Sequence, residues 1–185
     1  MAAYYLISQL PSLDGISEST SLPITEERFL ELCKQFLSKK AVGELLGISL
    51  VPPRNSEKSA SALIEAWNEG ESTLRLILGK FRAEKLNKPF DAENRTIDPA
   101  LVQAARTAIE SESPMEAEKI LSRFRLDFIE TLRPMDSFSE DYIFYYWLKL
   151  KILSRIRQFD SKIGEAEYRN IYNSIINKDR TEVAQ

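Results

Sequence analysis

The longest apolar stretch of the chain runs from Phe138 to Phe159 and reads FSEDYIFYYWLKLKILSRIRQF. It begins with an unbroken aromatic and aliphatic run, Tyr142 to Leu148, and further apolar residues follow at short intervals. The pattern predicts a helix, and a helix that is hydrophobic on all sides must be surrounded by its own domain or by a partner. Lysines and arginines interrupt the stretch well before about 18 apolar residues accumulate, so we do not expect it to span a membrane.

Two interpretations of this aromatic helix are open. As core, its rings form the centre of a C-terminal bundle. As interface, part of the ring surface stays exposed for another protein, which the enrichment of aromatic residues at interfaces permits. Both can hold at once, because one helix has more sides than a small bundle covers. The exposure of this helix is therefore the structural question that bears most directly on function.

Elsewhere the apolar residues recur every three or four positions, which is the spacing of amphipathic helices. Thr25 is the predicted cap of the first of these helices. A connector with a Pro-Pro pair follows at residues 47–58, and a helix should resume near Ser59. The apolar stripes are Phe29, Leu32, Cys33, Phe36 and Leu37; Ala41, Val42, Leu45 and Leu46; Leu63, Ile64 and Trp67; Leu74, Ile77, Leu78 and Phe81; Leu101, Val102, Ala105, Ala108 and Ile109; Ala117, Ile120, Leu121, Phe124, Phe128 and Leu132; and Tyr168, Ile171, Tyr172 and Ile175.

Prolines, glycines and short polar residues mark the ends of several helices. Asp98-Pro99 predicts a cap followed by proline in the first turn. Ser113-Pro114-Met115-Glu116 predicts a capping box, and Ser137-Phe138-Ser139-Glu140 predicts another for the aromatic helix. Gly47 is expected to supply a left-handed helix stop. Gly70 is expected to interrupt a longer helical segment.

The pattern as a whole predicts an all-α fold, an irregular multi-helix bundle of about seven or eight helices. Residues 4–10, YYLISQL, stay open as a short N-terminal strand or a helical turn. The polar loop 87–97 is the predicted linker between an N-terminal helical subdomain, 1–86, and a C-terminal helical subdomain, 98–177. Residues 178–185 are a predicted flexible tail.

Composition agrees with a soluble protein that can form a real core. The chain has 185 residues, of which 43% are apolar and 29% charged, and this length suits about one domain. The formal net charge of −3, spread evenly over both halves, argues against a general nucleic-acid binder. No secretory signal or membrane span is recognisable, so a cytoplasmic location is expected.

The chain offers little material for catalysis. It contains no histidine, which removes the commonest general base and the commonest zinc ligand. No glycine-rich phosphate-binding loop of the form G-x-x-x-x-G-K-[S/T] or G-x-G-x-x-G occurs. Cys33 lies on an apolar helical face and is expected to be a buried structural thiol. The acidic pairs stand too close in sequence to converge on one helix face, and they are Glu116/Glu118, Glu140/Asp141 and Glu165/Glu167. We therefore predict a protein that is not an enzyme, with no catalytic, cofactor-binding or metal-binding residues.

Four basic residues, Lys149, Lys151, Arg155 and Arg157, lie within the aromatic helix. As a functional patch they could contact phosphates or an acidic partner. On a helical wheel, however, Lys151 and Arg155 share one face while the other two lie well away. The preferred interpretation is that all four border the apolar body and reach solvent along their stems.

The opening residues carry a family resemblance. Tyr4-Tyr5-Leu6-Ile7-Ser8-Gln9-Leu10-Pro11-Ser12-Leu13, then Leu22-Pro23-Ile24 and Phe29-Leu30-Glu31-Leu32-Cys33, resembles an uncharacterised bacterial family typically encoded among V-type ATPase subunits. The resemblance covers the N-terminal third well and the remainder in length and helical character. A weaker one spans Asp141 to Ile176, which looks like a segment of the C-type (also called d-type) adaptor of V-type ATPases. That adaptor is an all-helical protein between the central rotor stalk and the membrane ring.

These resemblances imply a non-catalytic component or assembly factor of a bacterial V-type ATPase, in the role of a reduced C-type adaptor. Its partners would be the proteins of the central stalk or membrane ring, without nucleic acid and without direct membrane insertion. The protein would be a monomer on its own and peripheral to the inner membrane through the complex. One alternative is a helical regulatory or chaperone-like module that binds an unrelated helix in a groove. Another is an enzyme that uses only carboxylates, lysine and tyrosine.

Overall fold

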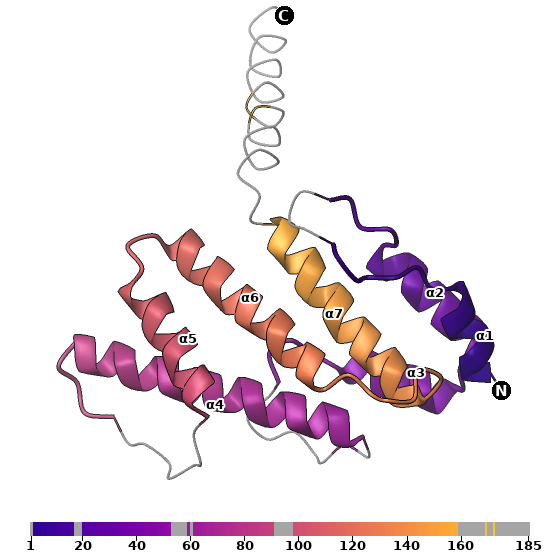
Figure 1. The fold of residues 1–185 in the computed structure, drawn as a ribbon, viewed down its shortest axis with the longest axis horizontal. Helices are drawn as coiled ribbons and strands as arrows, with labels where there is room; N and C mark the ends of the chain where they lie inside the picture. The colour runs from indigo at the N-terminus through magenta and orange to yellow at the C-terminus, as the bar shows by residue number, and fades with distance from the viewer. Residues whose placement is uncertain are drawn as a thin grey trace, which may run out of the picture.

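The computed structural model describes residues 2–16, 20–52, 59, 61–90 and 98–158, together with Arg169 and Tyr172. Within these residues the protein has seven helices and no strand, which confirms the predicted all-α fold (Figure 1). The helices are α1 (Ala2–Gln9), α2 (Glu26–Phe36), α3 (Lys39–Gly47), α4 (Ala62–Lys85), α5 (Pro99–Glu110), α6 (Pro114–Thr131) and α7 (Glu140–Gln158).

Helix α7 lies in the middle of the arrangement, with α6 on one side and α1 and α2 on the other (Figure 1). A larger hydrophobic core surrounds α7 and joins α1–α3, the first half of α4 and the end of α6. A smaller core lies between the second half of α4, α5 and the first half of α6. Both cores therefore include residues from each of the two predicted subdomains, because α4 and α6 contribute to both. The boundary at 87–97 stays a prediction, and residues 91–97 lie outside the described part.

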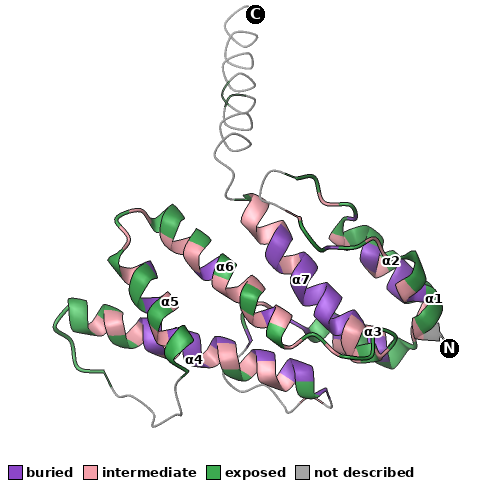
Figure 2. Cartoon of the chain, viewed as in Figure 1, coloured by how far each residue is buried: buried purple, intermediate pink, exposed green. Residues whose placement is uncertain are grey.

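The aromatic helix is enclosed by its own domain (Figure 2). Every residue from Ile143 to Leu150 is at most 6% exposed. Phe29 of α2 stacks against Tyr146 and Trp147, with ring centroids 5.3 and 5.2 Å apart. Large buried rings of this kind dominate core energetics. The core interpretation is thus right for these residues, whose rings present no free surface to a partner. None of the described helices is both long enough and apolar enough to cross a membrane.

Two expectations for glycines fail. Gly70 does not interrupt a helix, since α4 continues through it. A Cβ at this position would collide with the ring of Phe128 on α6, so the glycine permits close approach of the two helices. Gly47 does not supply a left-handed stop: α3 ends as Ile48 turns to extended backbone, with φ −72° and ψ 122°.

The start of the chain is helical, so the strand alternative for residues 4–10 is wrong. Helix α1 covers most of that segment, and Leu6 is fully buried in the larger core. Of the last helix predicted, through Tyr168 and Ile175, only Arg169 and Tyr172 are among the described residues, and the tail at 178–185 lies outside them.

The helix caps are partly as predicted. The side chains of Thr25 and Asp98 accept backbone hydrogen bonds at the starts of α2 and α5. Ser113 precedes α6 but makes no side-chain cap hydrogen bond, so the predicted capping box is not formed. Helix α7 is capped by Ser139 rather than Ser137, because Ser139 Oγ accepts from the Tyr142 amide at 3.2 Å.

Candidate functional site

Lys149 is buried in the centre of α7 and its ammonium group meets oxygen atoms from three parts of the chain. Its Nζ lies 2.7 Å from Asp14 Oδ1, 2.6 Å from Glu130 Oε1 and 3.3 Å from Tyr145 Oη. Arg133 adds a second cation, 3.6 Å from Asp14 Oδ2. The prediction that Lys149 reaches solvent is therefore wrong. Its stem is covered by the core, and the ammonium group is paired rather than solvated, as a buried charge requires.

We call Lys149, Asp14, Glu130, Tyr145 and Arg133 the lysine cluster. The contacts among these side chains determine which of them are charged. Burial alone would lower the pKa of Lys149, but the hydrogen bonds to Asp14 and Glu130 outweigh it and the pKa is raised. The hydrogen bond from Lys149 lowers the pKa of Asp14. Burial, then the hydrogen bond that its hydroxyl donates to Glu130, raise the pKa of Tyr145 to about 12. At neutral pH Lys149 stays charged and Tyr145 stays neutral, so neither is prepared to act as a base or nucleophile. The cluster ties α7 to α6 and to the segment after α1.

Two other basic residues of α7, Lys151 and Arg155, have partners elsewhere in the chain. Lys151 Nζ donates to the Ile48 carbonyl at 3.1 Å and lies 4.6 Å from the Trp147 ring centroid. Arg155 forms an ion pair with Glu118, with Nη2 2.8 Å from Oε1. Each of these two cations thus has a partner of its own. Their aliphatic stems run along the apolar body, while the charged ends bind the segment after α3 and helix α6.

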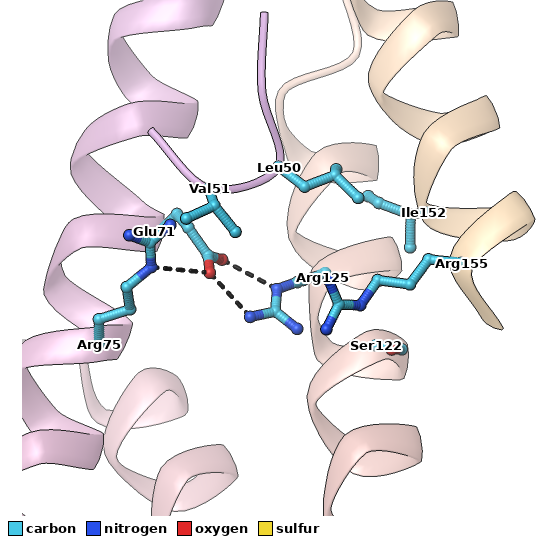
Figure 3. Close-up of a pocket in the computed structure, with 8 residues that line it drawn as sticks. All are labelled: Leu50, Val51, Glu71, Arg75, Ser122, Arg125, Ile152 and Arg155. Carbon is cyan, nitrogen blue, oxygen red and sulfur yellow. Dashed lines mark hydrogen bonds and ion pairs between the residues drawn. The ribbon is translucent and has the colours of Figure 1, made fainter. Parts of the chain in front are cut away.

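A small cavity of about 70 Å³ lies between α4, α6, α7 and the segment that follows α3. We call it the arginine cavity. Figure 3 shows Glu71 between Arg75 and Arg125, with Arg155 approaching Arg125 from α7. The cavity is lined by Leu50, Val51, Glu71, Arg75, Ser122, Arg125, Ile152 and Arg155.

Glu71 is the centre of the charged groups in the arginine cavity. Its side chain is 2% exposed, and its carboxylate accepts two hydrogen bonds from Arg125, from Nε at 2.9 Å and from Nη2 at 2.7 Å. Arg75 Nε donates a longer third bond at 3.4 Å. Burial alone would lower the pKa of Arg125, but the hydrogen bond to Glu71 outweighs it and the pKa is raised. This bidentate pair is the strong form of a carboxylate–guanidinium contact.

Two guanidinium nitrogens of the arginine cavity have no acceptor. Among the described residues, three buried side-chain nitrogens lack a hydrogen-bond partner: Arg75 Nη2, Arg125 Nη1 and Trp147 Nε1. The first two line the same cavity. Arg125 Nη1 lies 3.7 Å from Glu118, beyond hydrogen-bonding distance. Native proteins rarely leave buried donors unpaired without a functional or structural reason. A ligand in this cavity could accept the hydrogen bonds that these two nitrogens have available.

A larger open cleft of about 300 Å³ adjoins the arginine cavity. The two share Leu50, Val51 and Arg155 in their walls. The cleft also places Lys151 beside Arg155, so the two basic residues that share a helix face do line one surface feature. Its full lining is Glu26, Ser49, Leu50, Val51, Lys151, Arg155 and Gln158.

Exposed aromatic side chains gather where α1 meets the start of α7. Tyr4, Tyr5 and Phe138 are 53%, 58% and 49% exposed. The Tyr4 ring lies 4.8 Å from the Phe138 ring and 5.8 Å from the Tyr5 ring, between centroids. We call these three residues the aromatic corner. Exposed aromatic groups of this kind mark contact surfaces more often than isolated apolar residues do.

The other residues considered for chemistry take structural positions. Cys33 is fully buried, and burial raises the pKa of its thiol to about 12. Of the acidic pairs, Glu118 faces Arg155 while Asp141 accepts a hydrogen bond from the Ser61 hydroxyl at 2.7 Å. The Glu165/Glu167 pair lies outside the described residues. Within the described part of the chain, no three His, Cys, Asp or Glu side chains gather as a metal site would require.

Sequence reasoning missed the arginine cavity. Glu71 and Arg125 are 54 positions apart, and no pattern in the neighbouring sequence indicates that their side chains are in contact. The available signal was the spacing of Glu71 and Arg75, which an i, i+4 pair on one helix brings together. That spacing concerns α4 alone, and it gives no indication of Arg125 on α6.

Part of the chain matches a known family. Residues 99–179 match a family described as "Protein of unknown function (DUF2764)". The described part of this segment consists of α5, α6 and α7 with the residues that connect them, and Arg169 and Tyr172. The match does not include the opening residues that carry the V-type ATPase resemblance. In the structure the larger core around α7 also requires α1 to α4, so the matched segment is completed by the rest of the chain. The comparisons found no matching curated protein and no matching solved structure.

Proposed function

We propose that this protein is a non-catalytic component or assembly factor of a bacterial V-type ATPase, in the role of a C-type adaptor between central stalk and membrane ring. The resemblance of residues 4–33 supplies the identity of the complex. The all-α architecture is of the kind that the weaker resemblance, of Asp141 to Ile176 to the C-type adaptor, implies. The lysine cluster, held in protonation states unsuited to base or nucleophilic catalysis, supports a binding role.

The observation that carries the proposal is the aromatic corner. Tyr4 and Tyr5 belong to the segment of the resemblance, and both side chains are more than half exposed. The rings of α7, by contrast, are enclosed by the chain itself. Phe90 and Tyr172 are also exposed, but they lie outside residues 4–33, which carry that resemblance. We therefore expect the partner to contact the corner that Tyr4 and Tyr5 form with Phe138. Aromatic residues placed centrally in an interface commonly supply much of its binding energy.

The first experiment is co-purification from the native cell. The tagged full-length protein would be recovered from gently solubilised membranes, and the associated proteins identified by mass spectrometry. We expect V-type ATPase stalk and ring proteins in fixed proportion. Recovery of the protein alone would contradict the proposal. Recovery with partners unrelated to the ATPase would favour a helical regulatory or chaperone-like module instead.

A variant pair tests the contact surface. Tyr4→Ser combined with Tyr5→Ser should reduce the recovered ATPase proteins by about tenfold or more, since truncating a central aromatic typically costs about 2 kcal/mol. Leu86→Ser is the matched control, because Leu86 is 64% exposed and lies at the far end of α4 from α1 (Figure 1). Equal recovery from the double variant and the control would show that the aromatic corner is not the contact. Circular dichroism would check that both variants remain folded.

A further inference from the structure

We infer that the arginine cavity binds one small tetrahedral oxyanion of the phosphate class. The cavity has buried arginine nitrogens that lack an acceptor among the described residues, and it has room for a polyatomic ion. This inference does not depend on the proposed role in an ATPase, and a failure of either leaves the other standing.

The charged side chains that line the cavity are mostly cationic. The guanidinium groups of Arg75, Arg125 and Arg155 line it together with the carboxylate of Glu71. Arg125 and Glu71 are nearly buried, with side chains 12% and 2% exposed, and they pair with each other. A lining with this excess of guanidinium groups favours an anion over a cation as ligand.

The unpaired donors show where the anion would be held. Arg75 Nη2 and Arg125 Nη1 are buried and lack an acceptor among the described residues. Each belongs to a guanidinium group that uses its other nitrogens on Glu71 or, for Arg75 Nη1, on the Pro52 carbonyl at 3.3 Å. The remaining N–H groups are free to donate to an oxyanion. Arginine is the residue best suited to such charge-assisted contacts with phosphate.

The size and surroundings of the cavity favour a phosphate-like ion. About 70 Å³ is several times the roughly 10–15 Å³ that one water needs by the same measure. The guanidinium groups come from three helices, α4, α6 and α7 (Figure 3). A tetrahedral ion can accept hydrogen bonds from several directions, while a planar carboxylate pairs best with one guanidinium, as Glu71 already does with Arg125.

The adjoining cleft gives the ion a way in. It is open to solvent and shares Arg155 with the arginine cavity, and its wall also contains Lys151 and the carboxylate of Glu26. Cations along such a route raise the local concentration of anions. The cleft also has space for the body of a phosphorylated small molecule whose phosphate occupies the inner cavity.

The test is titration of the purified full-length protein in phosphate-free buffer. Inorganic phosphate and sulfate would be compared with acetate and chloride at equal ionic strength, by calorimetry and by melting temperature. We expect one-to-one binding of phosphate and sulfate, and a rise in melting temperature that grows with concentration. Absence of any difference between phosphate and chloride would overturn the inference. Acetate binding as tightly as phosphate would overturn the assignment to the phosphate class.

Two arginine variants locate the binding. Arg75→Gln removes one unpaired donor but leaves the Arg125–Glu71 pair intact, and it should weaken phosphate binding by about tenfold or more. Arg82→Gln is the matched control on the same helix, at an exposed position outside the cavity, and should bind phosphate as the unchanged protein does. An equal loss in both variants would mean non-specific attraction and would overturn the inference.

Titration with a phosphate monoester tests whether the bound oxyanion is a free ion or the phosphate group of an organic molecule. Glycerol 3-phosphate would be titrated beside inorganic phosphate under the same conditions. Tighter binding of the monoester would support an organic ligand that extends into the cleft. Tighter binding of inorganic phosphate would support a free ion. If neither bound more tightly to the unchanged protein than to Arg75→Gln, the arginine cavity would not be the site.

Discussion

The lysine cluster and the arginine cavity are both buried groups of opposite charges, yet they differ in what remains unpaired. Lys149 has three donors and three oxygen partners, so its ammonium group is satisfied. In the arginine cavity the carboxylate is satisfied and the cations are not, because Arg75 and Arg125 each keep a buried nitrogen without an acceptor among the described residues.

The two clusters also differ in how far their carboxylates can reach water. The side chains of Asp14 and Glu130, which pair with Lys149, are 57% and 38% exposed. Glu71 is nearly inaccessible. A cluster with partly solvated carboxylates and no spare donors is complete as it stands and holds segments together. A cluster with one deeply buried carboxylate and spare donors is incomplete, which is the property of a binding site.

Removal of the Glu71 charge should have the largest effect. Glu71→Gln leaves Arg125 and Arg75 facing each other without their shared anion, and breaking a buried pair in this way typically costs about 3–5 kcal/mol. The free energy of unfolding, measured by urea titration, should fall by that amount. Glu84→Gln is the matched control on α4, since its ion pair with Lys80 is long and exposed and should matter by less than about 1 kcal/mol. Similar losses in both variants would show that the burial of Glu71 is energetically unimportant.

Removal of the lysine charge should cost less. Lys149→Met keeps the buried stem, and its former partners Asp14 and Glu130 can turn to water. We expect a loss of about 1–3 kcal/mol in the same measurement, the usual cost of removing a charged hydrogen-bond partner. If Lys149→Met were the more destabilising of the two variants, the contrast between a partly solvated and a deeply buried cluster would be wrong.

The Tyr145 hydroxyl provides a smaller, pH-dependent test of the lysine cluster. Tyr145→Phe removes the hydrogen bond to Glu130 and should cost about 0.5–1.5 kcal/mol at neutral pH. The pKa of Tyr145 is raised from 10.0 to about 12 in the folded protein. Between these values the unfolded chain loses the proton while the folded protein keeps it, so the stabilisation is present below pH 10 and is lost as pH rises toward 12. Urea titrations from about pH 8 to about pH 11, on either side of the unfolded pKa, should therefore show the difference between Tyr145→Phe and the unchanged protein shrinking. A constant difference would contradict this origin.

The helices follow from local pattern, and the sequence analysis predicted them accordingly. The apolar stripes place α2 to α7 where they occur, and the polar residues Thr25 and Asp98 cap as expected, because these features depend on neighbours within one helical turn. Two of the predictions that failed, those for Gly70 and Lys149, concern residues whose surroundings are set by a distant part of the chain. Gly70 was expected to interrupt a helix on its own properties, but its surroundings are set by Phe128 on another helix.

The charged sites show the same difference between features set by nearby residues and features set by distant ones. A helical wheel gives the direction of Lys149 from the helix axis, but not the presence of Asp14, which is 135 residues away in sequence. Without that partner a lysine in an apolar helix is correctly expected to reach for water. The arginine cavity depends in the same way on α6 lying against α4. The sequence carries Glu71, Arg75 and Arg125, and only the packing of the two helices makes them a site.

The smallest expected effect on the free energy of unfolding is that of Arg75→Gln, which tests whether Arg75 is needed for stability. In buffer without phosphate or sulfate, Arg75→Gln should change the free energy of unfolding by no more than about 0.5–1 kcal/mol in either direction. The lost bond to Glu71 is long and partly solvated, and relief of repulsion from Arg125 acts against the loss. Urea titration in chloride checks this, with Arg133→Gln, the outer cation of the lysine cluster, as the comparison. A loss above about 2 kcal/mol would mean that Glu71 needs Arg75 to be satisfied. The arginine cavity would then be a closed structural cluster like that of Lys149, and its unpaired nitrogens would have no ligand to explain them.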